Sequence, residues 1–315
     1  MALYKGQQKI TPVKVVKKGG DYYVEQVNSD DGTCVLNITD ADSVNKWKEQ
    51  LCQLISNNIE QLEIPDGVEL IRSHSFEKCT NLKKIIIPSS VKYFGVSSPN
   101  DSSSDDGYCF SECESLLELD LSHLINDSGN YGTRYLCSYN TKLISLKFPP
   151  NIKTLGDLCC INCISLQNVQ LPDTITSLGV SCFNSCVDLE LDSLPQNLSS
   201  IGDSCFNNCK RITIKSLPSG VTKFGFLAFS GCFGLTEMTF NGDLQQFSSY
   251  AFAGCTRLTK FSFPNNTTVP TLVNVYAIPN GADFTGTIEV PKALLNRWKA
   301  STNWSQLTKA NWVGI

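Results

Sequence analysis

A cysteine recurs along much of the chain, and from residue 163 to residue 255 it does so at a fixed interval. The repeated cysteines are Cys79, Cys113, Cys163, Cys186, Cys209, Cys232 and Cys255. The last five are each 23 residues apart, and each lies in a short motif that overlays on the next, as in CFNSCVDL and CFNNCKRI. One further copy has Asn140 in place of the cysteine. A repeat of this length, held over many copies, predicts a solenoid in which stacked units share one continuous core.

Each unit also carries a strand pattern. If the repeated cysteine is position 0, apolar residues lie at +3, +6 and +8, as Leu116, Leu119 and Leu121 do, and a proline usually follows at +9. This alternation predicts a half-buried strand, and the proline suits its end because it cannot donate to a strand ladder. Segments such as ITSLG (175–179) then predict a return strand closed by a turn.

Equivalent side chains of stacked units are expected to form ladders about 4.8 Å apart. One ladder would be made by the repeated cysteines, in a structural role. A second would be made by phenylalanines, namely Phe76, Phe110, Phe183, Phe206, Phe229 and Phe252.

The repeated string of proline, valine, glycine, Ala-Phe-x-Gly-Cys and leucine over residues 59–265 resembles the BspA-like, Treponema-type leucine-rich repeat of bacterial surface antigens. The resemblance implies a strand-rich α/β leucine-rich-repeat solenoid of about eight units. It also implies a non-enzymatic binding or adhesion protein, of a kind found in bacteria, some protists and phages. The ending GTIEVPKALLNRWKASTNWS is similar to the C-terminal ending of that family, with Leu294, Leu295 and Trp298 on one helix face.

Three regions are expected. Residues 1–56 form a cap or attachment module of strands and an amphipathic helix at 42–55, residues 57–265 form the solenoid, and residues 266–315 form a C-terminal cap with a short helix. Caps are required because the end of a solenoid exposes apolar core. The opening MALYKGQQKITPV resembles the N-termini of phage tail and virion proteins, where such a module attaches the rest to a particle.

Charge and hydropathy exclude several classes of partner. A net charge of −4 gives no electrostatic basis for binding nucleic acid, and no apolar run is long enough to span a membrane. The N-terminus has no apolar region typical of an export signal, so we expect the chain to fold in the cytoplasm and to be displayed on a virion or a cell surface. The sequence leaves the oligomeric state open.

The cysteines allow three interpretations. C-x-x-x-C recurs at 109/113, 159/163, 182/186 and 205/209, which is compatible with metal ligation, with disulfides or with buried apolar packing. Ala228 and Ala251 replace the first cysteine in later copies, which favours packing because a buried cysteine behaves as a small hydrophobic residue. We therefore predict no metal and no cofactor.

Two features depart from the repeat. Insertions near 97–107 and 123–133 fall in adjacent units and predict two loops that project close together. In units 187–195 and 210–218, Asp192 and Lys215 occupy the +6 position, which should face the core. Such charges are costly inside unless they pair or the strand bulges. This predicts an Asp192–Lys215 pair, as a structural adaptation or as a functional notch.

No catalytic constellation is visible. Only His74 and His123 are available as histidines, neither has an obvious partner, and motifs for nucleophilic, metallopeptidase or phosphate chemistry are missing. We predict that the protein is not an enzyme.

The outward positions of the strands are the remaining candidates for function. They are polar, and the candidate ligand-binding residues are Lys84, Glu118, Asp120, Ser145, Lys147, Asn168, Gln170, Glu190, Thr213, Glu237, Thr239 and Lys260. The first hypothesis is recognition of a protein or glycan on a cell surface, either as a phage appendage or as a bacterial or protist adhesin. The alternative is an assembly protein whose solenoid packs against other subunits, virion subunits included.

Overall fold

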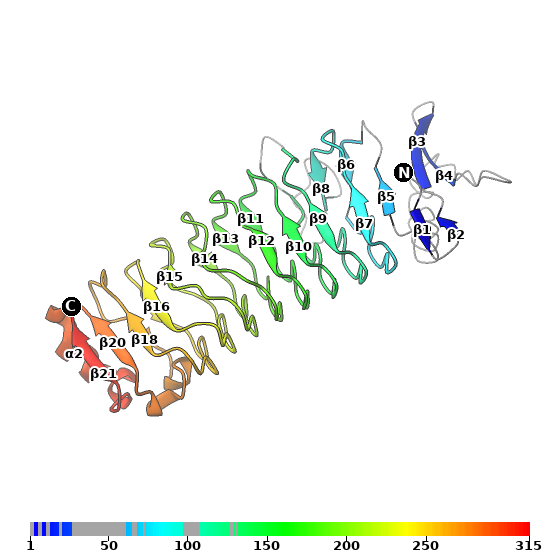
Figure 1. Cartoon of the computed structure of the whole chain (residues 1–315). Coiled ribbons are helices and arrows are strands. Elements are labelled where there is room, and N and C mark those ends of the chain that lie inside the picture. The colour runs from blue at the N-terminus through cyan, green and yellow to red at the C-terminus, as the bar shows by residue number, and fades with distance from the viewer. Residues whose placement is uncertain are drawn as a thin grey trace.

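The chain winds into an elongated solenoid of short parallel strands, which Figure 1 shows as a ladder from the N-terminal to the C-terminal end. This computed structural model describes residues 61–64, 68–71, 73–96, 107–125, 129 and 131–315, and the backbone of four strands at 3–5, 8–10, 13–18 and 21–26. The helix predicted at 42–55, most of the 97–107 insertion and part of the 123–133 insertion lie outside these residues.

One side of the solenoid, here called the strand face, consists of two parallel sheets. The first contains β5 (Gln61–Glu63), β7 (Lys84–Ile86), β9 (Glu118–Asp120), β10 (Ser145–Lys147) and β12 (Asn168–Gln170). The second contains β15 (Ser216–Leu217), β16 (Glu237–Phe240), β18 (Lys260–Ser262), β20 (Thr287–Val290) and β21 (Asn311–Gly314). Their register follows the sequence repeat: Ser145 lies beside Asn168, and Glu237 beside Lys260, 23 residues on in both cases.

The sheets extend beyond the repeated units at both ends. At the N-terminal end β3 (Val13–Lys18) pairs in parallel with β5 and in antiparallel with β4 (Asp21–Gln26), while β1 (Leu3–Lys5) and β2 (Gln8–Ile10) form a separate antiparallel pair. At the C-terminal end β20 and β21 continue the ladder of β18. Both predicted end regions therefore contribute strands to the solenoid sheets.

Return strands form two- and three-stranded ladders of their own. They are β6 (Leu70–Ile71) with β8 (Tyr93–Phe94), β11 (Thr154–Leu155) with β13 (Ser177–Leu178) and β14 (Ser200–Ile201), and β17 (Gln246–Phe247) with β19 (Thr271–Leu272). The return strand predicted from ITSLG is thus present as β13. In residues 221–225, which share that pattern, no strand forms.

The segments that end in the repeated cysteine, here called the turn edge, are not helices but tight turns. Each contains two residues with positive φ, such as Tyr108 (54°) and Glu112 (57°), and Gly231 and Gly254 take the second of these positions at 71° and 72°. Alternate backbone N–H groups donate to the next turn, as Phe76 does to the carbonyl of Cys109 at 2.9 Å. The turn edge is therefore a third hydrogen-bonded ladder, built without extended strands.

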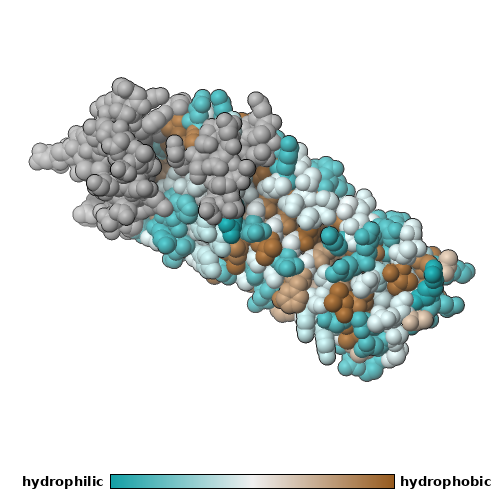
Figure 2. All heavy atoms as spheres, turned by 180° about the vertical axis from the view of Figure 1, so that it is seen from behind, coloured by the Kyte–Doolittle hydropathy of each residue, from teal (hydrophilic) through white to brown (hydrophobic). Residues whose placement is uncertain are grey.

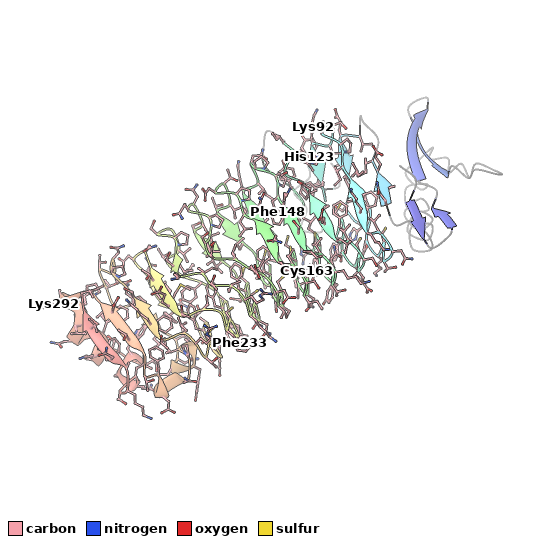
Figure 3. The ribbon with its side chains drawn as sticks, in the orientation of Figure 1. Lys92, His123, Phe148, Cys163, Phe233 and Lys292 are labelled. Atoms are coloured by element: carbon pink, nitrogen blue, oxygen red, sulfur yellow. The ribbon has the colours of Figure 1, made fainter. Side chains whose placement is uncertain are left out.

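Phenylalanine rings stack along the core beside the turn edge. Phe183, Phe206, Phe229 and Phe252 stack in succession with centroids 5.2–5.6 Å apart, and Phe76 stacks on Phe110 at 5.5 Å. In the two intervening turns, Cys137 and Cys160 occupy the phenylalanine position. Inward strand residues such as Phe148 are also buried, whereas Phe233 beside a repeated cysteine is 40% exposed (Figure 3).

The C-terminal end is closed by tryptophans. Short helical segments η1 (Val275–Ala277), η2 (Gly281–Asp283), η3 (Lys292–Leu294), α2 (Leu295–Ala300) and η4 (Trp304–Gln306) lie here. Trp298 and Trp304 are buried, 4.7 Å apart between ring centroids, and Trp298 packs on Phe263 at the same separation. The predicted apolar helix face therefore covers the last core layer.

Candidate binding cleft in the strand face

All twelve candidate ligand-binding residues lie on the strand face, and none is buried. Ten belong to its strands, whereas Glu190 and Thr213 lie between the two sheets. The register aligns them in rows along the solenoid, for example Glu118, Ser145 and Asn168 on β9, β10 and β12. The structure therefore gathers the predicted residues on one surface, but spreads them along its length.

Much of the charge on the strand face is paired between neighbouring turns. Lys147 contacts Asp120 at 2.8 Å, Lys215 contacts Glu237 at 3.2 Å, and Lys260 contacts Glu289 at 2.8 Å. Partial desolvation of Asp120 opposes its ionisation, but hydrogen bonds from Lys147 and Ser122 outweigh it and lower the pKa of Asp120 to about 2. The hydrogen bond to Asp120 also raises the pKa of Lys147. These pairs occupy side chains that would otherwise be available to a ligand.

The strand face is interrupted at residues 187–195, here called the sheet break. β12 is the last strand of the first sheet and β15 the first of the second, and residues 187–195, which lie between them on the strand face, form no strand. The amide of Glu190 still donates to the carbonyl of Gln167 at 3.0 Å, as in a regular turn. In the next turn, however, the amide of Thr213 donates to Leu191 rather than to Glu190, at 2.8 Å. The chain has slipped by one residue, as in a β-bulge.

This slip corrects the prediction for the two charged +6 residues. Asp192 and Lys215 are exposed, and Ile214 is buried in place of Lys215. The predicted Asp192–Lys215 pair does not form among the described residues, because Lys215 instead reaches Glu237 on β16. Asp192 accepts a hydrogen bond from the hydroxyl of Ser193 at 2.9 Å. Bulging keeps both charges in water, which costs less than burying a pair.

Two adjoining hollows open at the sheet break and together form the cleft. The larger has a volume of about 880 Å³ and the smaller about 400 Å³. The residues lining the larger are Asn168, Val169, Leu171, Asp173, Glu190, Leu191, Asp192, Ser193, Leu194, Pro195, Gln196, Arg211 and Thr213. Thr213, Gln196 and residues 192–194 line both hollows, and Lys215, Ser216, Pro218 and Asn241 extend the smaller.

The cleft has an apolar floor because the slip uncovers part of the core. Val169 and Leu171 hold the +6 and +8 positions, which are fully buried in turns such as that of Leu119 and Leu121. In the turn of β12 both are only half-buried, since no strand follows to cover them. Leu191 is also half-buried, while Leu194 is 5% exposed.

Several charged side chains at the rim of the cleft already form ion pairs or hydrogen bonds within the protein. Arg211 pairs with both Glu190 and Asp188, and the carboxylate of Asp173 accepts the amide of Gln196 at 3.0 Å. Three carboxylates and one guanidinium line the larger hollow, so that it is acidic. Of the predicted residues, Asn168, Glu190 and Thr213 lie in the cleft. Arg211, Asp173 and Gln196 were missed, although the charged +6 positions marked this turn as irregular.

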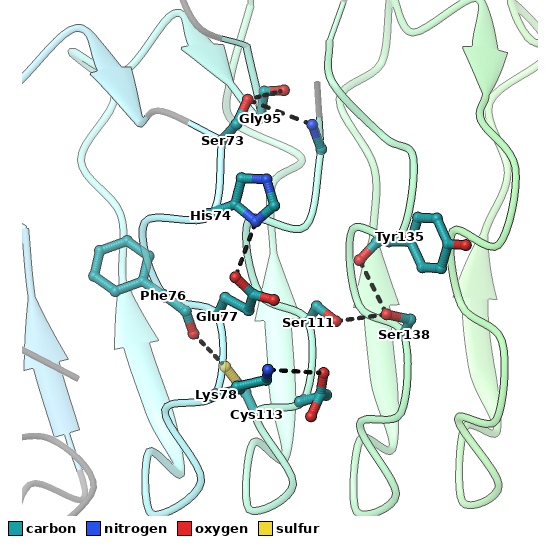
Figure 4. Close-up of polar contacts among 12 residues, drawn as sticks. Ser73, His74, Phe76, Glu77, Lys78, Gly95, Ser111, Cys113, Tyr135 and Ser138 are labelled. Carbon is teal, nitrogen blue, oxygen red and sulfur yellow. Dashed lines mark hydrogen bonds and ion pairs between the residues drawn. The ribbon is translucent and has the colours of Figure 1, made fainter. Parts of the chain in front are cut away.

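The thirteen cysteines of the described chain are free thiols, and all are buried. At the repeated position the thiol donates to a carbonyl of the preceding turn, as Cys113 does to Phe76 at 2.9 Å and Cys209 to Phe183 at 3.0 Å. Figure 4 shows the first of these bonds, beside the paired hydroxyls of Ser111 and Ser138. Burial raises the pKa of Cys137 to about 11 and that of Cys255 to about 12.

Asn140 replaces the repeated cysteine in one turn without breaking the ladder. Its side-chain oxygen accepts a hydrogen bond from the amide of Cys113 at 2.8 Å, and the residue is fully buried.

Among the described residues, no group of three or more histidine, cysteine or acidic side chains has a geometry suited to a metal ion. His74 contacts Glu77 at 2.9 Å, and His123 contacts the backbone carbonyl of Ile87 at 2.7 Å.

A row of aromatic residues on the turn edge was also missed. His74, Tyr108 and Tyr135 stack with centroids 4.6 and 4.3 Å apart, and Tyr250 stacks on Tyr276 at 5.7 Å near the other end. His74, Tyr108, Tyr135 and Tyr250 share the first positive-φ position of each turn, which a search for strand periodicity does not examine. Figure 2 shows the molecule from behind, where hydrophobic side chains lie among hydrophilic ones over the C-terminal half.

Comparison with protein families gives one match. The model described as the BspA type leucine-rich repeat region matches six copies, over residues 50–190 and 182–272. A search of curated proteins found no match. Within the part of the chain that the structure describes, no helix has the length and apolar character needed to cross a membrane. The resemblance of the N-terminus to phage tail proteins gains no support from these comparisons.

Several solved structures are similar to the chain. A leucine-rich repeat protein of Treponema pallidum is 24% identical, with 63% of this chain and 78% of that one covered and a TM-score of 0.41. One from Bacteroides ovatus is 19% identical, with 98% and 100% covered and a TM-score of 0.36. A leucine-rich cell surface protein of Faecalibacterium prausnitzii is 16% identical, with 96% and 95% covered and a TM-score of 0.39.

Proposed function

The chain belongs to the BspA type leucine-rich repeat family, and we propose that it is a non-enzymatic recognition protein that binds its ligand at the cleft in the strand face. The ligand is a protein or a glycan of a cell surface. The solenoid serves as a rigid scaffold that holds the cleft in a fixed shape.

The observation that supports this proposal is the local contrast on the strand face. Where the strands are regular, the surface is a flat sheet with core residues covered and several charges paired between turns. At the sheet break the surface is concave and mainly polar, with the half-buried Val169 and Leu171 on an apolar floor. Ligand sites are usually concave and partly apolar, with a few polar groups that fix orientation. The cleft combines these features on the face that carries the predicted binding residues.

Binding of the labelled full-length protein to intact bacterial cells and to a glycan array tests the proposal. Thr213 is exposed and lines both hollows, so Thr213→Trp fills the cleft. Thr236 is the same residue type at the same position one turn later; it is exposed and lines neither hollow. Thr236→Trp is therefore a matched control for the size and hydrophobicity of the new ring.

We expect saturable binding by the wild type and by Thr236→Trp, and binding at least about tenfold weaker by Thr213→Trp. Equal binding by all three proteins would place recognition elsewhere. The absence of binding by the wild type to any cell or glycan, with the fold intact, would refute recognition and favour the assembly alternative. A search for co-assembling subunits, virion subunits included, would then follow.

A further inference from the structure

The sheet break leaves β12 and β15 each without a paired strand on one side. Continuing the 23-residue register of β10 and β12 would pair Asn168 with Leu191 and Gln170 with Ser193. Neither pair forms in the continuously described part of the chain, residues 131–315, where β12 and β15 are both edge strands. An edge strand presents backbone N–H and C=O groups that can pair with another chain. Here such an edge lies within the solenoid, beside a hollow, rather than at its end.

We propose that the cleft binds an extended polypeptide segment, which adds to the edge of β12 as a strand and directs a lysine or arginine toward Asp192. This inference rests on the proposed function, since it names the class of ligand for the same site. Strand addition obtains affinity from main-chain hydrogen bonds and specificity from pockets for alternate side chains.

The floor of the cleft provides those pockets. Val169 lies on β12 and Leu171 directly follows the end of this strand, and because the two residues are two apart in extended chain their side chains lie on the same side. Both are half-buried and lie beside Leu194 and Pro195 in the larger hollow. An added strand would cover this uncovered core surface with its own inward side chains, as the regular turns do with theirs.

The charge of the larger hollow favours a basic segment. Arg211 already pairs with Glu190 and Asp188, whereas the donor to the exposed carboxylate of Asp192 is the hydroxyl of the adjacent Ser193. Asp192 is thus placed to accept a cationic side chain at the junction of the two hollows, both of which it lines. The lining includes no aromatic ring, so a sugar would find no flat apolar face on which to stack.

Selection from a display library of random short peptides on the immobilised full-length protein tests this inference. We expect enriched peptides with a lysine or arginine among alternating apolar residues. Their binding should be lost in Thr213→Trp, kept in Thr236→Trp, and weakened about fivefold or more in Asp192→Asn.

Backbone methylation of an enriched peptide separates strand addition from side-chain docking. Each peptide nitrogen is methylated in turn, which removes one N–H donor at a time. An added strand directs alternate N–H groups to β12, so methylation at every second residue should weaken binding about fivefold or more, and the residues between should tolerate it. Methylation effects without this period of two would overturn strand addition.

The two proposals can fail separately. If cell binding depends on Thr213 but no peptide is enriched, or if an array glycan alone binds the cleft, the recognition function stands and the peptide inference is wrong. If the wild type binds neither cells nor peptides, both proposals fail.

Discussion

The turn of β10 and the turn of the sheet break have the same length and the same two positive-φ positions at the turn edge, yet only one of them forms a strand on the strand face. In the first, Leu143, Leu146 and Phe148 point inward and are buried. In the second, Leu189 is buried, but Leu191 and Asp192 have exchanged the apolar and polar positions. A change of one residue in a pattern of period two moves side chains to the opposite face. The comparison shows that a small pattern change converts a flat sheet into a cleft.

The disturbance does not reach the turn edge. At the turn edge of the same turns, the amide of Phe183 donates to Cys205 at 2.8 Å and Phe183 stacks on Phe206. The thiols of Cys186 and Cys209 keep their bonds to the preceding turns. A solenoid tolerates a local break because the remaining ladders still hold each turn to its neighbours.

The largest predicted effect is a loss of stability at alkaline pH, caused by the buried thiols of this unbroken turn edge. Burial raises the pKa of eight thiols, among them Cys182, Cys186, Cys209 and Cys232. A raised folded-state pKa means that the stabilising contribution is complete below the unfolded value of about 8.5 and is lost as pH rises toward the folded value. Within that pH window, each such thiol lowers the free energy of unfolding by up to about 1.4 kcal/mol per pH unit.

We therefore expect alkaline unfolding above about pH 9, measured by circular dichroism in a pH series. Cys182→Ala is a suitable variant, because alanine holds the same position at Ala228 and Ala251. It should reduce the slope of stability against pH by the contribution of one thiol. A free energy of unfolding that is constant from pH 8 to pH 11 would contradict the burial of the thiols.

Thiol labelling compares the turn edge at the sheet break with the turn edge of a regular turn. Faster labelling at Cys186 than at Cys113 would show that the break extends to the turn edge.

The next effect compares two leucines at the same +8 position. Leu121 is fully buried in a regular turn, whereas Leu171 is half-buried at the cleft. Leu121→Ala should lower the free energy of unfolding by about 2–5 kcal/mol, and Leu171→Ala by less than half as much, because its side chain already contacts water. Urea denaturation of both variants measures the difference. Equal losses would mean that the cleft is closed in solution.

A third variant repairs the strand pattern. Leu191→Ser combined with Asp192→Leu restores a polar +5 and an apolar +6 residue, as in the turn of Leu146. We expect residues 191–193 to pair with β12, joining the two sheets and stabilising the protein by about 1 kcal/mol. Slower hydrogen exchange of the amides of Val169 and Leu171 would report the closure, and ligand binding at the cleft should be lost. Unchanged exchange would show that other residues cause the break.

The smallest predicted effect on stability comes from the ion pairs of the strand face, of which Asp120 and Lys147 form one. The pKa of Asp120 is lowered to about 2, so its contribution is present above the unfolded value of about 3.9 and is lost as pH falls toward 2. Because Asp120 and Lys147 are both largely exposed, Asp120→Asn should cost less than about 1 kcal/mol at pH 6 and almost nothing near pH 2. A cost that is the same at both pH values would contradict a role for this ion pair.

Sequence alone was sufficient for the repeat, because every turn must present the same residues to its neighbours. The spacing of Cys163, Cys186 and Cys209 predicted the period of 23 residues that separates paired residues of β10 and β12. The phenylalanine positions gave the stacked rings, and Leu294, Leu295 and Trp298 gave the C-terminal closure. The outward residues followed from strand alternation. These features depend on periodicity, which is local and repeated.

Only the tertiary structure decided what the irregular turn does. The sequence marked Asp192 and Lys215 as misplaced, but an ion pair and a bulge both satisfied the pattern. The bulge formed because leaving the two charges in water costs less free energy than burying them as a pair. Glu237 on the next turn also lies within reach of Lys215. The cleft arises because the slip at Leu191 leaves Val169 and Leu171 without a covering strand. Such a surface is a property of neighbouring turns together, and no single repeat contains it.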